Sequence, residues 1–301
     1  MRVLLAMGCL ALVVGLNAAG PAIPDDPSIS KDGLRSGFVT TSDGVKLHYL
    51  ETGSGPAILF VPGWTGVAEF WAPQMKHFAA THRVVALDPR SQGDSDKPAE
   101  GNYHERRGRD IREVIEQLHL APAIVVSWSM AVPETLSMVN EFGSDAIRAV
   151  VFVDGRVSNE TSPEALQAFH ARMRSLMLDR KQAARAIVPT WFRKPHANAL
   201  YESMALASIK TPTNTAIALQ TNALSFDYRP VLAKLPKDAL LVYRAGPENQ
   251  TFAKTVRDRL PSAQIEFMDG VGHAMFLDDS ERFNSIMDGF VKSLGGPPKR
   301  N

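Results

Sequence analysis

Short, uninterrupted apolar runs recur along this chain and alternate with amphipathic segments, and this alternation limits the possible folds more than any other feature. Continuous apolar runs are typical of strands that are buried on both faces of a parallel sheet. Segments with helical spacing, such as 110–118 and 281–294, lie between them. The pattern predicts an α/β sheet with crossover helices. The expected strands are Val45–Leu50, Ala57–Val61, Arg83–Leu87, Ala123–Val126, Ala149–Val153, Leu240–Arg244 and Gln264–Met268.

One long region breaks the alternation. From about Val157 to Pro236 only helical segments are indicated, and prolines separate them. An insertion this long between two strands exceeds ordinary loop length, so we predict a helical cap over 156–236. The core then comprises 37–155 and 237–294, with a lead segment at 23–36 and a disordered tail at 295–301. The aromatic and methionine side chains of the cap could form its own small core or the wall of an apolar pocket.

The first residues indicate export. A basic start at Arg2 precedes an apolar run from Val3 to Leu16, and small residues follow up to Ala22. This order is typical of a secretory signal peptide (1–22) cleaved near Ala22, which predicts a secreted or periplasmic protein. The run is shorter than the roughly 20 residues of a membrane-spanning helix, so we expect no membrane span after cleavage. The one cysteine, Cys9, lies in this segment, and the mature chain would therefore contain no disulfide.

Charge and motifs exclude several functions. The formal charge is +1, with 33 basic and 32 acidic residues spread along the chain, whereas nucleic-acid binding needs clustered cations. The sequence contains no metal-ligand motif and no phosphate-binding glycine motif, so we predict neither a metal nor another cofactor. Nothing in the pattern indicates an oligomeric state.

The most informative motif surrounds Ser129. An apolar strand leads directly into Ser127-Trp128-Ser129-Met130-Ala131 and then into a helical segment. A nucleophile elbow places its serine in a strained turn between a strand and a helix, which requires small residues two positions away on each side. Ser127 and Ala131 occupy these positions in place of the usual glycines. The motif alone therefore leaves two interpretations open, an elbow or an ordinary capped helix.

Three further motifs follow predicted strands in a definite order: 60–64 (Phe-Val-Pro-Gly-Trp), 87–98 (Leu-Asp-Pro-Arg-Ser-Gln-Gly-Asp-Ser-Asp-Lys-Pro) and 269–276 (Asp-Gly-Val-Gly-His-Ala-Met-Phe). Together with the serine motif, they resemble the α/β-hydrolase superfamily over about 36–294, in its branch of cap-bearing serine esterases, haloperoxidase-like and dehalogenase-like enzymes. The resemblance implies a mostly parallel eight-stranded sheet flanked by helices, with the cap inserted after strand 6.

The resemblance also implies roles for individual residues. Ser129 matches the nucleophile and His273 the general base, and an imidazole suits this role because it titrates near neutral pH. The backbone N–H groups of Trp64 and Met130 match the oxyanion hole. The other seven histidines lie in no matching context.

The position of the catalytic acid is ambiguous in the sequence. Many relatives carry an aspartate after the strand that follows the cap, but here Asn249 occupies that position and Glu248 precedes it. Some relatives use the end of the strand after the nucleophile helix, where this chain has Asp154. A neutral amide does not stabilise an imidazolium as a carboxylate does. We favour Asp154, with Glu248 as the alternative.

The expected activity is hydrolysis of a carboxylic ester, or of a lactone, through an acyl-enzyme on Ser129. A serine nucleophile argues against dehalogenation and epoxide opening, which proceed through an aspartate ester in this superfamily. Trp128, Trp191, Phe192 and Met275 are candidate pocket residues for a small to medium, mainly apolar substrate. A perhydrolase or haloperoxidase-like activity, carbon–carbon bond hydrolysis, and a slow-turnover binding protein remain alternatives.

Overall fold

The structure is a computed structural model that describes residues 28–29 and 34–295. The signal peptide predicted at 1–22 lies outside these residues, as does most of the tail predicted at 295–301, and export stays a prediction. Within the described ranges, no helix combines the length and the hydropathy needed to cross a membrane.

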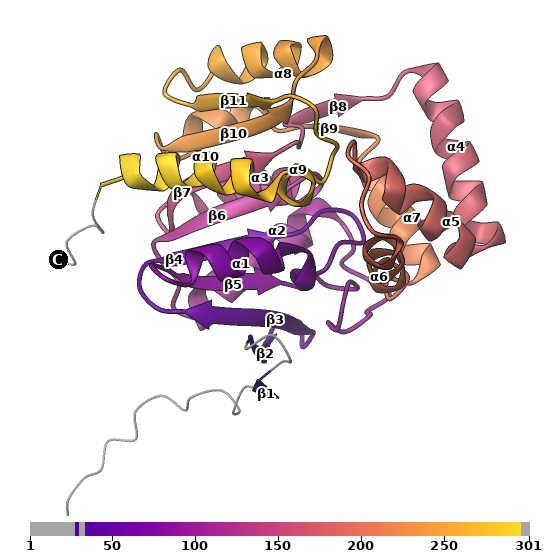
Figure 1. Cartoon of the computed structure of the whole chain (residues 1–301), viewed down its shortest axis with the longest axis horizontal. Coiled ribbons are helices and arrows are strands. Elements are labelled where there is room, and N and C mark those ends of the chain that lie inside the picture. Colours follow the sequence, from indigo (N-terminus) through magenta and orange to yellow (C-terminus); the bar gives the residue numbers. More distant parts are fainter. Residues whose placement is uncertain (1–27, 30–33, 296–301) are drawn as a thin grey trace, which may run out of the picture.

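A twisted sheet forms the centre of the molecule (Figure 1). Its strand order is β1-β2-β3-β5-β4-β6-β7-β10-β11, and every neighbouring pair from β5 onward is parallel. Apart from the two-residue β1, these are the eight strands of the predicted α/β-hydrolase fold. The strands are β1 (Ser28–Ile29), β2 (Arg35–Thr40), β3 (Lys46–Gly53), β4 (Ala57–Val61), β5 (Arg83–Leu87), β6 (Ala123–Trp128), β7 (Ile147–Val153), β10 (Ala239–Arg244) and β11 (Gln264–Met268).

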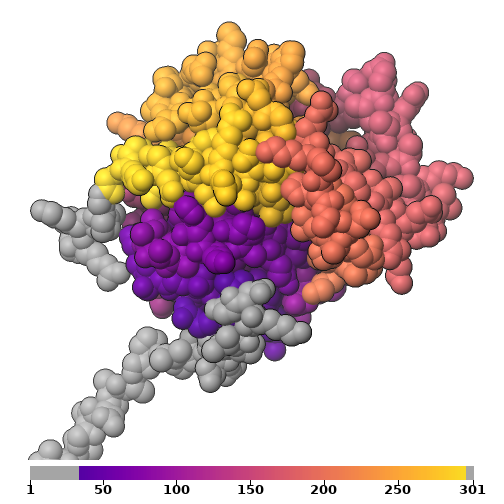
Figure 2. All heavy atoms as spheres, viewed as in Figure 1, coloured from indigo at the N-terminus to yellow at the C-terminus, as the bar shows by residue number. Residues whose placement is uncertain are grey.

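Helices cover both faces of the sheet because successive strand residues point to opposite sides. In β4, Ile58 and Phe60 pack into one core with α1 and α10, whereas Leu59 and Val61 pack into the other with α2, α3 and α8. Figure 2 shows α10, in yellow, against the N-terminal part of the core, in purple. The helices of the core are η1 (Ala68–Trp71), α1 (Ala72–Phe78), α2 (His104–Gln117), α3 (Ala131–Phe142), α8 (Pro247–Arg257), α9 (Met275–Asp278) and α10 (Ser280–Ser293). One more helix, η3 (Arg229–Lys234), lies between β7 and β10 and within the range 156–236 predicted for the cap, but its Val231 and Leu232 pack into the second core.

The predicted helical insertion is present between β7 and β10 and lies at one end of the molecule (Figure 1). One detail differs from the prediction, because two short strands at its ends pair into an antiparallel ribbon. Each is only three residues long and is largely polar, so the sequence carries no apolar run to reveal it. The insertion contains β8 (Ser158–Glu160), α4 (Pro163–Leu178), α5 (Arg180–Ile187), η2 (Val188–Trp191), α6 (Asn198–Ser208), α7 (Thr213–Asn222) and β9 (Ser225–Asp227).

Candidate active site

Ser129 lies in a tight turn between β6 and α3. Its φ is 56°, in the left-handed region that residues with a Cβ rarely adopt. Its backbone N–H donates a hydrogen bond to the carbonyl oxygen of Val153 at 2.9 Å, which ties the turn to the neighbouring strand. This is the strained strand-to-helix geometry of an elbow, and it presents a serine at the carboxyl edge of the sheet.

The residues around the turn show how the chain accommodates serine in place of glycine at 127. The Ser127 and Thr135 hydroxyls are fully buried and lie 2.7 Å apart, so each satisfies the other. Two glycines in neighbouring loops allow these loops to lie close to the Ser129 turn. A Cβ at Gly63 would lie 2.8 Å from the Cβ of Ser129, and one at Gly155 would lie 2.3 Å from Val132.

Three side chains from the loops after β6, β7 and β11 form one hydrogen-bonded chain. His273 Nε2 lies 2.9 Å from Ser129 Oγ, and His273 Nδ1 lies 2.6 Å from Asp154 Oδ2. A carboxylate only accepts hydrogen bonds, so Nδ1 carries the imidazole proton and Nε2 is left to accept from the serine hydroxyl. The arrangement can therefore remove a proton from Ser129.

The Asp154 carboxylate is buried and accepts hydrogen bonds from two side chains. Its side chain is 2% exposed, and its Oδ2 also accepts a hydrogen bond from Arg244 Nε at 2.6 Å. Burial raises the pKa of the carboxyl, but the hydrogen bond from His273 together with the hydrogen bond and positive charge of Arg244 outweighs burial, so the pKa lies below its ordinary value. Asp154 is thus a carboxylate at neutral pH.

The alternative acid lies elsewhere. Glu248 is at the start of α8, its side chain is 72% exposed, and it forms an ion pair with Arg156. The Asn249 side chain donates to the backbone carbonyl of Arg244 at 2.8 Å. The structure therefore brings Asp154, and not Glu248, to His273.

The loop after β4 and the start of α3 place the two candidate oxyanion donors near Ser129. Gln92 Nε2 donates to the carbonyl oxygen of Gly63 at 3.0 Å. The Trp64 N–H lies on the opposite side of the same trans peptide and is directed away from Gln92. Met130 is the N-cap residue of α3, and the N–H groups at a helix start have no partner within the helix. These two amides could bind a developing oxyanion.

We expect Gly63→Ala to lower kcat about 100-fold, the size of effect seen when one oxyanion donor is lost. The added Cβ has no room beside Ser129 and must displace the loop that carries Trp64. Steady-state kinetics on an aryl ester would measure the effect. Gly289→Ala is the matched control, because a Cβ there meets no atom within 4 Å. An unchanged kcat in Gly63→Ala would contradict the proposed oxyanion hole.

The loop that carries His273 is fastened to the cap. Asp278 Oδ2 accepts hydrogen bonds from the backbone N–H of Gly272 at 2.6 Å and from that of Arg193 at 2.8 Å. The Ala274 N–H donates to the Trp191 carbonyl oxygen at 2.8 Å. Because Asp278 is 4% exposed, these bonds are shielded from water. The position of His273 therefore depends on cap residues 191–194.

A cavity of about 790 Å³ opens beside Ser129 and His273. Of the predicted pocket residues, Trp128 and Trp191 line it, whereas Met275 is fully buried in the core and Phe192 packs half-buried against that core. The lining differs from an apolar pocket wall, which was one of the two possibilities for the aromatic and methionine side chains of the cap. It includes these polar residues: Arg156, Asn159, Arg172, Thr190, Gln220 and Arg244.

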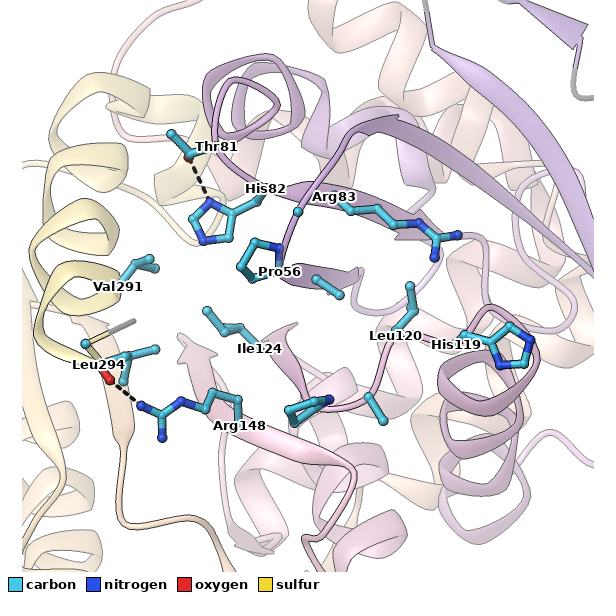
Figure 3. A pocket seen from close by; sticks show the side chains of 15 residues that line it. Pro56, Thr81, His82, Arg83, His119, Leu120, Ile124, Arg148, Val291 and Leu294 are labelled. Carbon is cyan, nitrogen blue, oxygen red and sulfur yellow. Dashed lines mark hydrogen bonds between the residues drawn. The ribbon is translucent and has the colours of Figure 1, made fainter. Parts of the chain in front are cut away.

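A second cavity of about 710 Å³ lies at the opposite edge of the sheet, at the amino ends of β4, β6 and β7 (Figure 3). His82 and His119 border it, and Thr81 Oγ1 lies 2.8 Å from His82 Nδ1. The described residues that line it include neither a serine nor a carboxylate. It therefore offers no nucleophile with a base and an acid, in contrast to the cavity at Ser129.

One cluster has the composition of a metal site. His48, Asp88 and Asp94 bring ligand atoms within 4.8 Å of one another. Asp88 Oδ2 lies 2.8 Å from His48 Nδ1 and accepts from the Asp94 N–H, while Asp94 pairs with Lys210. These contacts use the donor atoms to brace the loop after β5.

Comparison with known proteins agrees with the fold. The profile of the alpha/beta hydrolase family matches residues 58–286. A non-heme haloperoxidase of Rhodococcus erythropolis is 23% identical over 85% of this chain and 99% of its own. An esterase of Exiguobacterium antarcticum superposes with a TM-score of 0.78 at 23% identity, covering 85% of this chain and 98% of the esterase. An enol-lactonase of Burkholderia xenovorans superposes with a TM-score of 0.72 at 19% identity, covering 85% of this chain and 99% of the enol-lactonase.

Proposed function

The chain belongs to the α/β-hydrolase family, and from this premise we propose that it is a serine hydrolase that cleaves a carboxylic ester or lactone. The observation that carries the proposal is the hydrogen-bonded chain from Ser129 through His273 to Asp154, with distances of 2.9 and 2.6 Å. Relatives named as an esterase and an enol-lactonase are in keeping with this reaction class.

The proposed reaction is acyl transfer. Ser129 Oγ attacks the ester carbonyl while His273 Nε2 takes its proton, and Asp154 stabilises the imidazolium. The Trp64 and Met130 N–H groups hold the negative oxygen of the tetrahedral intermediate. His273 then gives its proton to the departing alcohol, and a water molecule activated by His273 releases the acid.

A second candidate follows from the relative that is named a non-heme haloperoxidase. If hydrogen peroxide attacks the acyl-enzyme in place of water, the product is a peracid. Hydrolysis of a carbon–carbon bond would use the same three residues. A binding protein with slow turnover is disfavoured, because nothing needs to move to bring His273 within hydrogen-bond distance of Ser129.

The test is labelling with a fluorophosphonate followed by intact-mass measurement, beside turnover of 4-nitrophenyl esters with and without peroxide. We expect one adduct on the wild type and none on Ser129→Ala. Ser203→Ala removes an exposed hydroxyl of the cap and should label normally. A folded wild type without an adduct, or an adduct that persists in Ser129→Ala, would overturn the proposal.

A further inference from the structure

Arginines from three separate elements meet at the cavity beside Ser129. Arg156 follows β7, Arg172 lies on α4 of the cap, and Arg244 ends β10. Aspartate and glutamate are absent from the described residues that line this cavity. The carboxylates that pair with Arg244 and Arg156, those of Asp154 and Glu248, line adjoining pockets. The wall therefore presents three guanidinium groups, and Arg172 is the one of the three without an ion pair among the described residues.

Each arginine keeps hydrogen-bonding capacity for a ligand. Arg172 forms no ion pair with any residue in the described part of the chain. Arg156 pairs with Glu248, an exposed pair of the kind that contributes little, and its guanidinium lies over the Phe252 ring at 4.0 Å from the centroid. Arg244 commits its Nε to Asp154, which leaves its two terminal nitrogens.

We propose that the substrate carries an anionic group, a carboxylate or a phosphate, that Arg156, Arg172 and Arg244 bind while its ester carbonyl lies at Ser129. The proposal rests on the function proposed above and names its substrate class. Guanidinium groups suit this role because they present paired donors that match the oxygens of carboxylates and phosphates. The Gln220 side chain, which also lines the cavity, adds an amide donor.

The kinetic test compares three 4-nitrophenyl esters of one chain length: the hydrogen adipate, the methyl adipate and a trimethylammonio-hexanoate. We expect kcat/KM to be about tenfold higher for the anionic ester than for the neutral one, and lowest for the cationic one. Arg172→Gln should lower kcat/KM about tenfold for the anionic ester and less than twofold for the neutral ester. Arg174→Gln is the matched control, an exposed arginine on the same helix that does not line the cavity.

A binding test on Ser129→Ala separates recognition from turnover. Calorimetry would compare hexanoate, hexyl phosphate and hexanamide, and we expect at least one anion to bind about tenfold more tightly than the amide. The anion that binds more tightly shows whether the arginines recognise a carboxylate or a phosphate. Equal binding of all three, or equal kcat/KM for the anionic and neutral esters, would overturn this inference while ester hydrolysis stands. Anion binding without any ester turnover or fluorophosphonate adduct would instead overturn the proposed function.

Discussion

Replacing Asp154 by asparagine is expected to lower kcat by about 10⁴-fold, as loss of the orienting carboxylate does in serine proteases. In this protein the Asp154 carboxylate lies 2.6 Å from His273 Nδ1 and fixes the proton there. An asparagine amide can donate to Nδ1, which favours the tautomer with its proton on Nε2. That tautomer cannot accept the Ser129 proton. Steady-state turnover of a neutral 4-nitrophenyl ester measures the loss.

Glu248→Gln is the matched comparison. Its side chain is 72% exposed and contacts Arg156 rather than His273, so we expect kcat on the neutral ester to stay within about twofold of the wild type. Circular dichroism on both variants would separate misfolding from lost chemistry. If Asp154→Asn kept a tenth of the activity while Glu248→Gln lost most of it, the assignment of the acid would be reversed.

Arg107→Met is expected to lower the free energy of unfolding by about 3–5 kcal/mol, because it leaves a buried charge without its partner. Arg107 and Glu134 are each 1% exposed, and Arg107 Nε lies 2.5 Å from Glu134 Oε1. Burial raises the pKa of the Glu134 carboxyl, and the Arg107 charge only partly offsets this. Arg107 also donates to Gln92 at 3.0 Å, and Gln92 holds the Gly63 carbonyl. Activity should therefore fall together with stability.

Urea unfolding measures the first effect, with two controls. Arg109→Gln breaks an exposed pair on the same helix, with side chains 50% and 34% exposed, and should change stability by less than about 1 kcal/mol. The double variant Arg107→Met with Glu134→Met removes both charges and should recover part of the loss. A loss for Arg107→Met no larger than that for Arg109→Gln would show that the buried pair does not stabilise the fold.

The parallel strands could be predicted from the sequence because burial on both faces demands continuous apolar runs, as in 57–61 and 83–87. The sequence analysis does not predict β2, which lies between the two-residue edge strand β1 and β3, because all but one of its side chains are exposed or half-buried and its sequence, Arg-Ser-Gly-Phe-Val-Thr, mixes polar with apolar residues. The cap ribbon was missed for a similar reason. The pattern of apolar residues along a sequence predicts only strands whose side chains are buried. These strands are held mainly by backbone hydrogen bonds, which leave no such pattern.

The residues of the candidate active site also differ in how readily the sequence predicts them. Ser129 and His273 lie in local motifs next to apolar strands, which makes them visible in the sequence. The acid required a choice between two strand ends, and the geometry distinguishes Asp154 from Glu248. The arginines of the cavity wall come from 156, 172 and 244 and share no motif. The pairing of β7 with β10 places Arg156 near Arg244, and the packing of the cap against the core adds Arg172.

The attachment of the His273 loop to the cap through Asp278 has an evolutionary consequence. Cap segments are a natural place for change in substrate preference, but here residues 191–194 also set the position of the imidazole. A substitution in this region that changes substrate specificity can therefore also change the turnover rate. A lineage that replaced this part of the cap would have to preserve the backbone amides that Asp278 accepts from, whatever side chains it changed.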